Sequence, residues 1–181
     1  MSDTAWSEAE VLHAATVRRY LATVGSVATD RWAAEPRPGK WSPGAVTSHL
    51  VLTYDALAGE QSAGLAIPIA FSPLKAWVLR TFVLPRLLKG RPFPPGVKAP
   101  REVRPKGDMS GREVLAAEFE RAAGRFLAAY QSARQRPGAK ATHPYFGRLA
   151  LSDMFRFASI HTEHHRRQLE WAASAAQQME R

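Results

Sequence analysis

The sequence predicts an all-α protein: a four-helix bundle with a long proline-rich, basic crossover between its second and third helices. Four long segments carry apolar residues at helical spacing, and no run alternates as a strand would. Residues 67–106 hold eight of the thirteen prolines and separate the second helical segment from the third. One long crossover among shorter connections is typical of a helical bundle. We therefore expect residues 1–181 to form a single domain of this class.

The first predicted helix spans about 8–32. Ser7 and Glu10 have the spacing of a capping box, in which each side chain satisfies a free backbone N–H at the helix start. Apolar residues then recur at helical spacing and predict a buried stripe. The stripe includes Leu12, Leu21, Val24 and Val27.

The second predicted helix spans about 43–66. Ser42 is its expected N-cap, and Pro43 suits the first helical position, where no backbone N–H is needed. One face carries mainly apolar residues together with a histidine, so this histidine is expected to point inward. The residues of this face are Val46, His49, Leu50, Thr53 and Leu57.

The crossover, 67–106, divides into two parts. Residues 72–90 predict a short helix that enters at Ser72-Pro73 and breaks at Pro85, and residues 91–105 predict no regular structure. The apolar and basic piece 77–88 has three interpretations: packing on the bundle, a dimer contact, or a membrane surface. We favour packing or dimerisation, because its apolar residues do not form one clean stripe.

The third predicted helix spans about 111–135 and ends before Pro137-Gly138. Ser110 and Glu113 again have the spacing of a capping box. Large apolar residues follow at helical spacing and predict a buried face. They are Leu115, Phe119, Ala122, Phe126 and Tyr130.

The fourth predicted helix spans about 153–179. Ser152 is its expected N-cap, and Asp153 is favourable at the positive end of the helix dipole. One face combines small and apolar residues with histidines, so the histidines are expected to point inward. This face holds Met154, Ala158, His161, His165, Gln168 and Ala172.

Composition excludes several classes of protein. The chain has no cysteine, which removes disulfides, thiolate metal sites and cysteine nucleophiles. The formal net charge is +9, but nine Lys/Arg and one acid give residues 72–106 a charge of +8. This local basicity comes with no known nucleic-acid motif, so nucleic acid is an unlikely partner. No signal peptide or spanning segment is evident, and we expect a cytoplasmic location.

Three histidines lie close together near the C-terminus. His161 and His165 are four residues apart, so their imidazoles project from one helix face and can reach one ion. His164 diverges from His165 by about 100° and is assigned to the flank. Arg166 and Arg167 are expected to turn toward solvent.

A metal site needs a third ligand from another helix. His49 is the best candidate, because it lies in the middle of the second helix on its apolar face. A divalent cation would supply one common partner for three buried imidazoles. We therefore predict a site at His49, His161 and His165, with His164 and Gln168 as neighbours that could support it.

Other catalytic motifs fail on spacing. The zincin and inverzincin patterns each require a glutamate where this chain has Thr162 and His164, respectively. A di-iron bundle needs paired Glu-x-x-His motifs, and the single copy at Glu10 and His13 has no partner on the fourth helix. His143 is expected to be a loop residue and is a weaker candidate for a group near the site. No catalytic acid or base can be assigned.

Residues 41–50 (WSPGAVTSHL), 143–149 (HPYFGRL) and 161–169 (HTEHHRRQL) together resemble the DinB/YfiT-like superfamily. The resemblance implies a four-helix bundle of up-down-down-up topology with a long second connection, often dimeric. It also implies that the metal ligands are His49, His161 and His165. The basic, proline-rich crossover departs from the family pattern.

The leading functional hypothesis is a divalent-metal-dependent enzyme in which three imidazoles leave positions open for water or a thiol. Zinc or nickel is favoured, while iron and copper also suit imidazole ligands. The resemblance implies transfer or isomerisation with a low-molecular-weight thiol, and hydrolysis is the other open reaction. The alternatives are a homodimer whose metal is structural or vestigial and, last, an anion- or nucleic-acid-binding module that uses the crossover.

Overall fold

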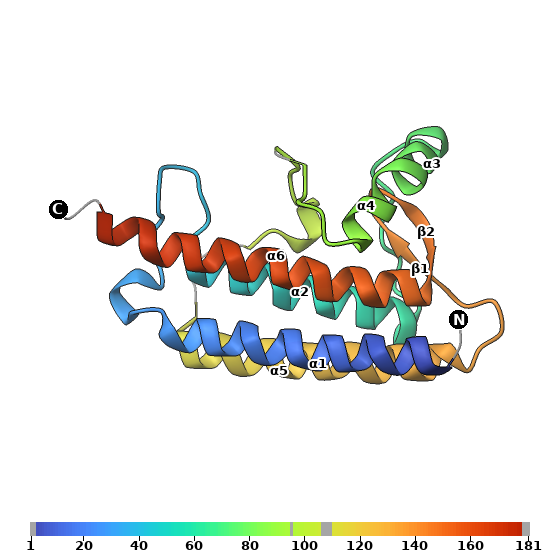
Figure 1. The fold of residues 1–181 in the computed structure, drawn as a ribbon, viewed down its shortest axis with the longest axis horizontal. Helices are drawn as coiled ribbons and strands as arrows, with labels where there is room; N and C mark the ends of the chain where they lie inside the picture. The colour runs from blue at the N-terminus through green and yellow to red at the C-terminus, as the bar shows by residue number, and fades with distance from the viewer. Residues whose placement is uncertain (1–2, 95, 106–109, 179–181) are drawn as a thin grey trace.

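Four long helices pack in two layers in the computed structural model, which describes residues 3–94, 96–105 and 110–178 (Figure 1). One layer pairs the first and fourth long helices, and the other pairs the second and third. The first and last helices run in one direction and the other two in the opposite direction, which confirms the predicted up-down-down-up bundle. The helices are α1 (Asp3–Ser26), α2 (Pro43–Ala63), α5 (Arg112–Arg134) and α6 (Leu151–Gln178).

Aromatic side chains from all four helices fill the core. Phe126 stacks on Phe155 with ring centroids 5.1 Å apart, and Tyr54 meets Phe126 edge to face at 5.0 Å. The apolar face predicted for the third helix is buried throughout, whereas Leu12 of the predicted first stripe is exposed. Burial of this many large rings provides most of the driving force that brings the helices together.

The predicted N-cap residue was right for α2 and wrong for the other three long helices, although α5 begins within one residue of its predicted start. Ser42 caps α2 by accepting a hydrogen bond from the Ala45 N–H at 3.2 Å. α1 already begins at Asp3, so Ser7 lies inside it, and a separate 3₁₀ turn, η1 (Thr29–Arg31), follows its end. Ser152 likewise lies inside α6. Ser110, the predicted cap of α5, is replaced in that role by Gly111.

The capping-box glutamates have other partners. Glu10 accepts a hydrogen bond from Trp6 Nε1 within α1 at 2.8 Å and one from Gln131 Nε2 at 2.9 Å, which links α1 to α5. Glu113 pairs with Arg112 at 2.7 Å. The capping pattern matched in sequence because the spacing is short and common, but Glu10 turns to Gln131 of α5 and Glu113 to the adjacent Arg112.

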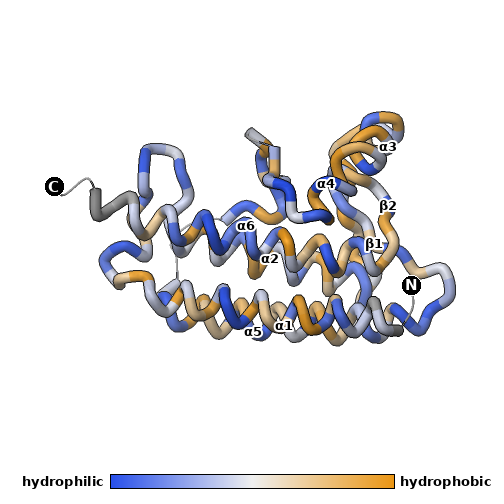
Figure 2. Tube along the Cα trace, in the orientation of Figure 1, coloured by the Kyte–Doolittle hydropathy of each residue, from blue (hydrophilic) through white to orange (hydrophobic). Residues whose placement is uncertain are grey.

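The crossover contains the predicted short helix as α3 (Pro73–Phe82), and a second short helix, α4 (Leu84–Leu88), follows the break. Ser72 caps α3 by accepting from the Lys75 N–H. The break falls at Val83, and Pro85 lies in the first turn of α4, where proline is tolerated. Figure 2 shows α3 as a largely hydrophobic segment that projects from the bundle.

The remainder of the crossover is more ordered than predicted. A 3₁₀ turn, η2 (Arg101–Val103), contradicts the expectation that residues 91–105 hold no regular structure. It lies against α2, and its contacts orient a histidine described below. Lys106 of the predicted basic segment lies outside the described residues.

A two-stranded hairpin precedes α6, although the sequence predicted no strands. β1 (Lys140–His143) pairs antiparallel with β2 (Gly147–Ala150). Gly147 takes the left-handed conformation that ends the tight loop, with φ of 69°. Glu60 of α2 accepts from the Thr142 N–H at 2.9 Å. Strands of four residues are too short to show a clear alternation, which is why sequence reasoning missed them.

Candidate metal centre

Two helices supply the three histidines that the sequence singled out. His49 comes from the first half of α2, and His161 and His165 come from the middle of α6. One nitrogen of each ring lies within 4.8 Å of one nitrogen of each of the others. His49 and His165 are buried, whereas His161 keeps part of its surface accessible. The structure therefore brings together the three residues predicted to form a site, while their metal binding stays a prediction.

The two α6 imidazoles face each other directly. His165 Nε2 and His161 Nε2 are 3.0 Å apart, with the ring planes nearly perpendicular at 89°. The His49 ring meets both edge to face, with centroid distances of 4.8 Å to His165 and 5.3 Å to His161. Nitrogens on one zinc ion lie roughly 3 Å apart, because each bond is about 2 Å long. The His161 and His165 nitrogens already have this spacing, and all three nitrogens lie within 4.8 Å of one another.

Hydrogen bonds at the outer nitrogens determine which atoms face the centre. His49 donates its Nδ1–H to the Val103 carbonyl at 2.7 Å, since a carbonyl can only accept. His165 donates its Nδ1–H to Gln168 Oε1 at 2.8 Å. Both neutral rings therefore present an Nε2 lone pair to the centre. Partners of this kind fix the tautomer and ring orientation in metal sites.

The electrostatic environment keeps the imidazoles neutral. Burial is the main cause that lowers the pKa of His161 and of His165 well below the ordinary value, and neighbouring imidazoles lower both further. Burial also lowers the pKa of His49, against a smaller opposing effect of the Val103 hydrogen bond. Neutral rings keep the lone pairs that metal coordination requires near pH 7.

Aromatic side chains wall the cluster. Trp41 lies against His49, with centroids 5.0 Å apart, and Phe157 stacks parallel to His161 at 5.8 Å. Phe93 of the crossover contacts His161 at 5.9 Å. Sequence reasoning missed Phe93 and Val103, because both lie in an irregular, proline-rich segment without periodicity. No sequence signal indicated that this segment would fold back over the histidines.

His164 lies at the edge of the cluster, as its position predicted. It is exposed, and its ring contacts Phe93 at 4.6 Å and His165 at 5.0 Å. Arg166 is only half-buried and pairs with Glu163 at 2.9 Å, while Arg167 is exposed. The α6 surface next to the cluster is therefore charged and open to solvent.

His143 lies in the hairpin, and the Phe157 ring separates it from the histidine cluster. Its Nδ1 accepts from the backbone N–H of Tyr145 at 3.1 Å and of Phe146 at 3.3 Å. It contacts Phe157 at 4.8 Å, and Phe157 in turn stacks on His161. Burial lowers the pKa of His143 to about 3, so the ring is neutral and carries its proton on Nε2.

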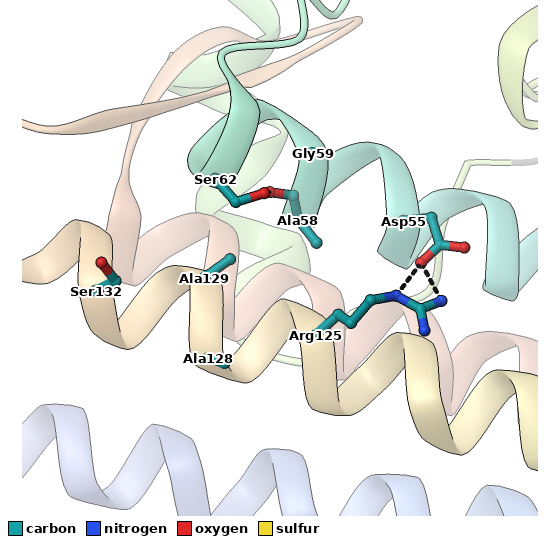
Figure 3. Close-up of a pocket in the computed structure, with 8 residues that line it drawn as sticks. All are labelled: Asp55, Ala58, Gly59, Ser62, Arg125, Ala128, Ala129 and Ser132. Carbon is teal, nitrogen blue, oxygen red and sulfur yellow. Dashed lines mark hydrogen bonds and ion pairs between the residues drawn. The ribbon is translucent and has the colours of Figure 1, made fainter.

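A groove on the opposite side of α2 shares none of the histidines (Figure 3). It runs between α2 and α5 and has a volume of about 470 Å³. Arg125 closes one end by binding Asp55 Oδ1 through two nitrogens, at 2.6 and 3.0 Å. The rest of the lining consists of small side chains, and no buried titratable group faces it. The groove is therefore no candidate for the chemistry of the cluster.

The fold and the cluster together define a helical-bundle protein with three convergent histidines. A model of the DinB superfamily matches residues 12–169, and the chain therefore belongs to the DinB superfamily. A crystal structure of TT2238, described as a four-helix bundle protein, is similar with a TM-score of 0.56 and 23% identity. The match covers 91% of this chain and 98% of that one. No curated protein matches the chain.

Proposed function

We propose that the protein is a divalent-metal-dependent enzyme whose ligands are His49, His161 and His165. The observation that supports this most is the convergence of three imidazole nitrogens within 4.8 Å, with two outer nitrogens held by Val103 and Gln168. Histidines that served only as core polar groups would be expected to pair with different partners. Here one ring nitrogen from each of three histidines converges on the same region, and burial disfavours protonation of these rings.

The donor set suits borderline metals. Imidazole nitrogen binds zinc, nickel, iron and copper, and we favour zinc or nickel. The His161–His165 contact at 3.0 Å needs a proton between two nitrogens when no ion is bound. A cation would displace that proton, which the neutral His161 ring would then carry on Nδ1. Because burial keeps the rings neutral near pH 7, binding should weaken only at acidic pH, where the imidazoles become protonated.

Three protein ligands leave coordination positions open, and a divalent ion there lowers the pKa of a bound water or thiol. The chain itself contributes the walls: Trp41, Phe93 and Phe157 exclude water from the apolar sides. His143 contacts the Phe157 ring from the hairpin side. We propose a small molecule as substrate, with transfer to or from a low-molecular-weight thiol favoured and hydrolysis as the other reaction.

The experiment that tests the metal site is elemental analysis of protein purified without a histidine tag and then exposed to zinc or nickel. We expect about one ion per chain. His49→Ala and His161→Ala should each lose it, whereas His164→Ala, at the exposed edge, should retain it. Absence of bound metal in the wild type, or equal loss in all three variants, would refute the site.

Activity assays separate an enzyme from a structural metal centre. Metal-loaded protein is incubated with small thiols plus electrophilic substrates, and separately with activated esters and amides. Turnover that disappears in His161→Ala supports the enzyme. One metal per chain without turnover on any class would favour the non-catalytic alternative, and sedimentation velocity would then test the predicted homodimer.

A further inference from the structure

Helix α3 carries apolar residues on two opposite faces. Its inner face packs on the protein: Ala76 is buried, and Leu79 and the following Val83 are half-buried against the core. The outer face is exposed to solvent. The exposed fractions there are 71% for Leu74, 49% for Trp77, 40% for Val78 and 59% for Phe82.

These four residues, the outer stripe, lie along one side of the helix. Positions i, i+3, i+4 and i+8 fall on one face, because each residue turns the helix by about 100°. Trp77 and Phe82 also contact each other edge to face at 6.4 Å, so the stripe contains one joined aromatic surface. Because apolar residues lie on both faces of α3, the sequence showed no single clean apolar stripe.

Basic residues surround the outer stripe, and acids are absent nearby in the chain. Residues 61–101 contain seven Lys/Arg and no Asp or Glu. Lys75 lies over the Phe71 ring at 3.8 Å, and Arg80 reaches the Arg148 carbonyl at 3.1 Å. Arg86 of α4 and Lys89, which follows α4, are exposed. Such a surface is complementary to a partner that is both apolar and negatively charged.

The shape of the region distinguishes between possible partners. α3 projects at the outer edge of the molecule, beyond α6 and the hairpin (Figure 1), and its hydrophobic character is evident there (Figure 2). A second copy of this chain would bring the same cationic surface against itself, which is repulsive. A projecting helix with tryptophan, phenylalanine and leucine on one side and basic residues around it is typical of an interfacial membrane anchor.

We propose that α3 binds the surface of an anionic lipid bilayer, inserting Leu74, Trp77, Val78 and Phe82 while the surrounding lysines and arginines contact the headgroups. This contact is peripheral, since no described helix is long and apolar enough to cross a membrane. The proposal is independent of the metal centre, because neither the stripe nor its basic border includes a histidine.

Vesicle co-sedimentation tests the proposal. Full-length protein is mixed with vesicles of phosphatidylcholine alone or with about one-third phosphatidylglycerol. We expect binding to the anionic vesicles that weakens with salt. Trp77→Ser with Phe82→Ser should reduce the partition coefficient by at least about 30-fold. Arg86→Glu with Lys89→Glu should reduce it by about fivefold or more for each charge removed.

Matched controls remove apolar surface elsewhere. Val11→Ser on α1 and Val114→Ser on α5 delete side chains that are 70% and 52% exposed, and both should bind like the wild type. Equal binding to neutral and anionic vesicles, or equal loss in the control variants, would overturn the proposal. The proposal would also be overturned if the wild type formed a dimer that did not bind vesicles and the Trp77→Ser, Phe82→Ser variant were monomeric. The stripe would then be a contact between copies.

Discussion

At the scale of single residues, the outer nitrogens of the histidines are as informative as the inner ones. Val103 and Gln168 each accept an Nδ1–H, and these contacts turn two Nε2 atoms toward one point. His161 and His165 were predictable as a pair from spacing, because i and i+4 residues share a helix face, and His49 was predictable from its place on the apolar face of the second helix. Gln168 was predictable because it lies on the same helix face. Val103 was not, since it acts through its backbone carbonyl, which every residue type has.

Gln168 provides a test of this orienting role. Gln168→Ala should weaken zinc binding by about 10- to 100-fold, because the His165 ring loses the partner that fixes its tautomer. Gln168→Glu, whose carboxylate also accepts the Nδ1–H, should restore most of the affinity. Isothermal titration calorimetry measures both values, and equal affinity in wild type and Gln168→Ala would contradict the role.

Two buried tyrosines should respond oppositely to loss of their hydroxyls. Tyr130 OH has no hydrogen-bond partner among the described residues, whereas Tyr20 OH binds Thr47 Oγ1 at 2.9 Å. Tyr130→Phe should therefore leave the free energy of unfolding unchanged or raise it by up to about 1 kcal/mol. Tyr20→Phe should lower it by about 1 kcal/mol. Urea unfolding compares the two, and a clear loss in Tyr130→Phe would reveal a missing partner.

His13 should make the fold sensitive to acid. It is buried among Tyr54, Phe126 and Phe155, and burial lowers its pKa to about 4, against a smaller opposing hydrogen bond to the Ala123 backbone. Between the ordinary pKa and about 4, the unfolded chain binds a proton that the folded chain does not. Stability is therefore lost as pH falls through this window, by about 3 kcal/mol for one such group.

The variant His13→Gln isolates that contribution. Its free energy of unfolding should fall less steeply between pH 7 and 4 than that of the wild type, measured by urea unfolding in chelator-treated samples. All other histidines are common to both proteins, so the difference in slope reports on His13 alone. Parallel pH profiles would show that His13 is not the acid-sensitive group.

At the scale of elements, the long helices were predictable and their surroundings were less so. The face from Leu115 to Tyr130 is periodic over several turns, and this length makes the signal strong. The hairpin, at four residues a strand, is held by contacts distant in sequence, such as the Thr142 N–H to Glu60. The position of η2 over α2 also depends on tertiary contacts, which local sequence patterns do not encode.

Two glycines of different conformation should respond with opposite signs. Gly147 has φ of 69°, and an added Cβ would lie 3.7 Å from the Ala76 side chain. Gly147→Ala should lower the free energy of unfolding by about 1 kcal/mol or more. Gly124, inside α5 with open space around it, should gain about 0.5–1 kcal/mol as alanine. Each kcal/mol shifts the thermal midpoint by about 2–4 °C, and changes of equal sign would refute this account.

At the scale of the whole molecule, the bundle, the crossover and the histidine cluster form one arrangement. Antiparallel α2 and α6 place His49 opposite His161 and His165, and the crossover covers them with Phe93 and η2. The bundle with its long second connection followed from helix count and connection length, whereas the up-down-down-up direction of the helices followed from the resemblance to the DinB/YfiT-like superfamily. The path of the crossover did not follow, since a proline-rich segment has no periodicity to constrain it.

The central claim is that three imidazoles bind one divalent ion, and X-ray absorption spectroscopy at the metal edge measures this directly. For zinc-loaded, tag-free protein, we predict three imidazole nitrogens at about 2.0–2.1 Å, with any remaining ligand being a light atom from solvent. The His49→Ala protein should show at most two imidazoles on any residual ion. A spectrum with only oxygen ligands, or one unchanged in His49→Ala, would contradict the account.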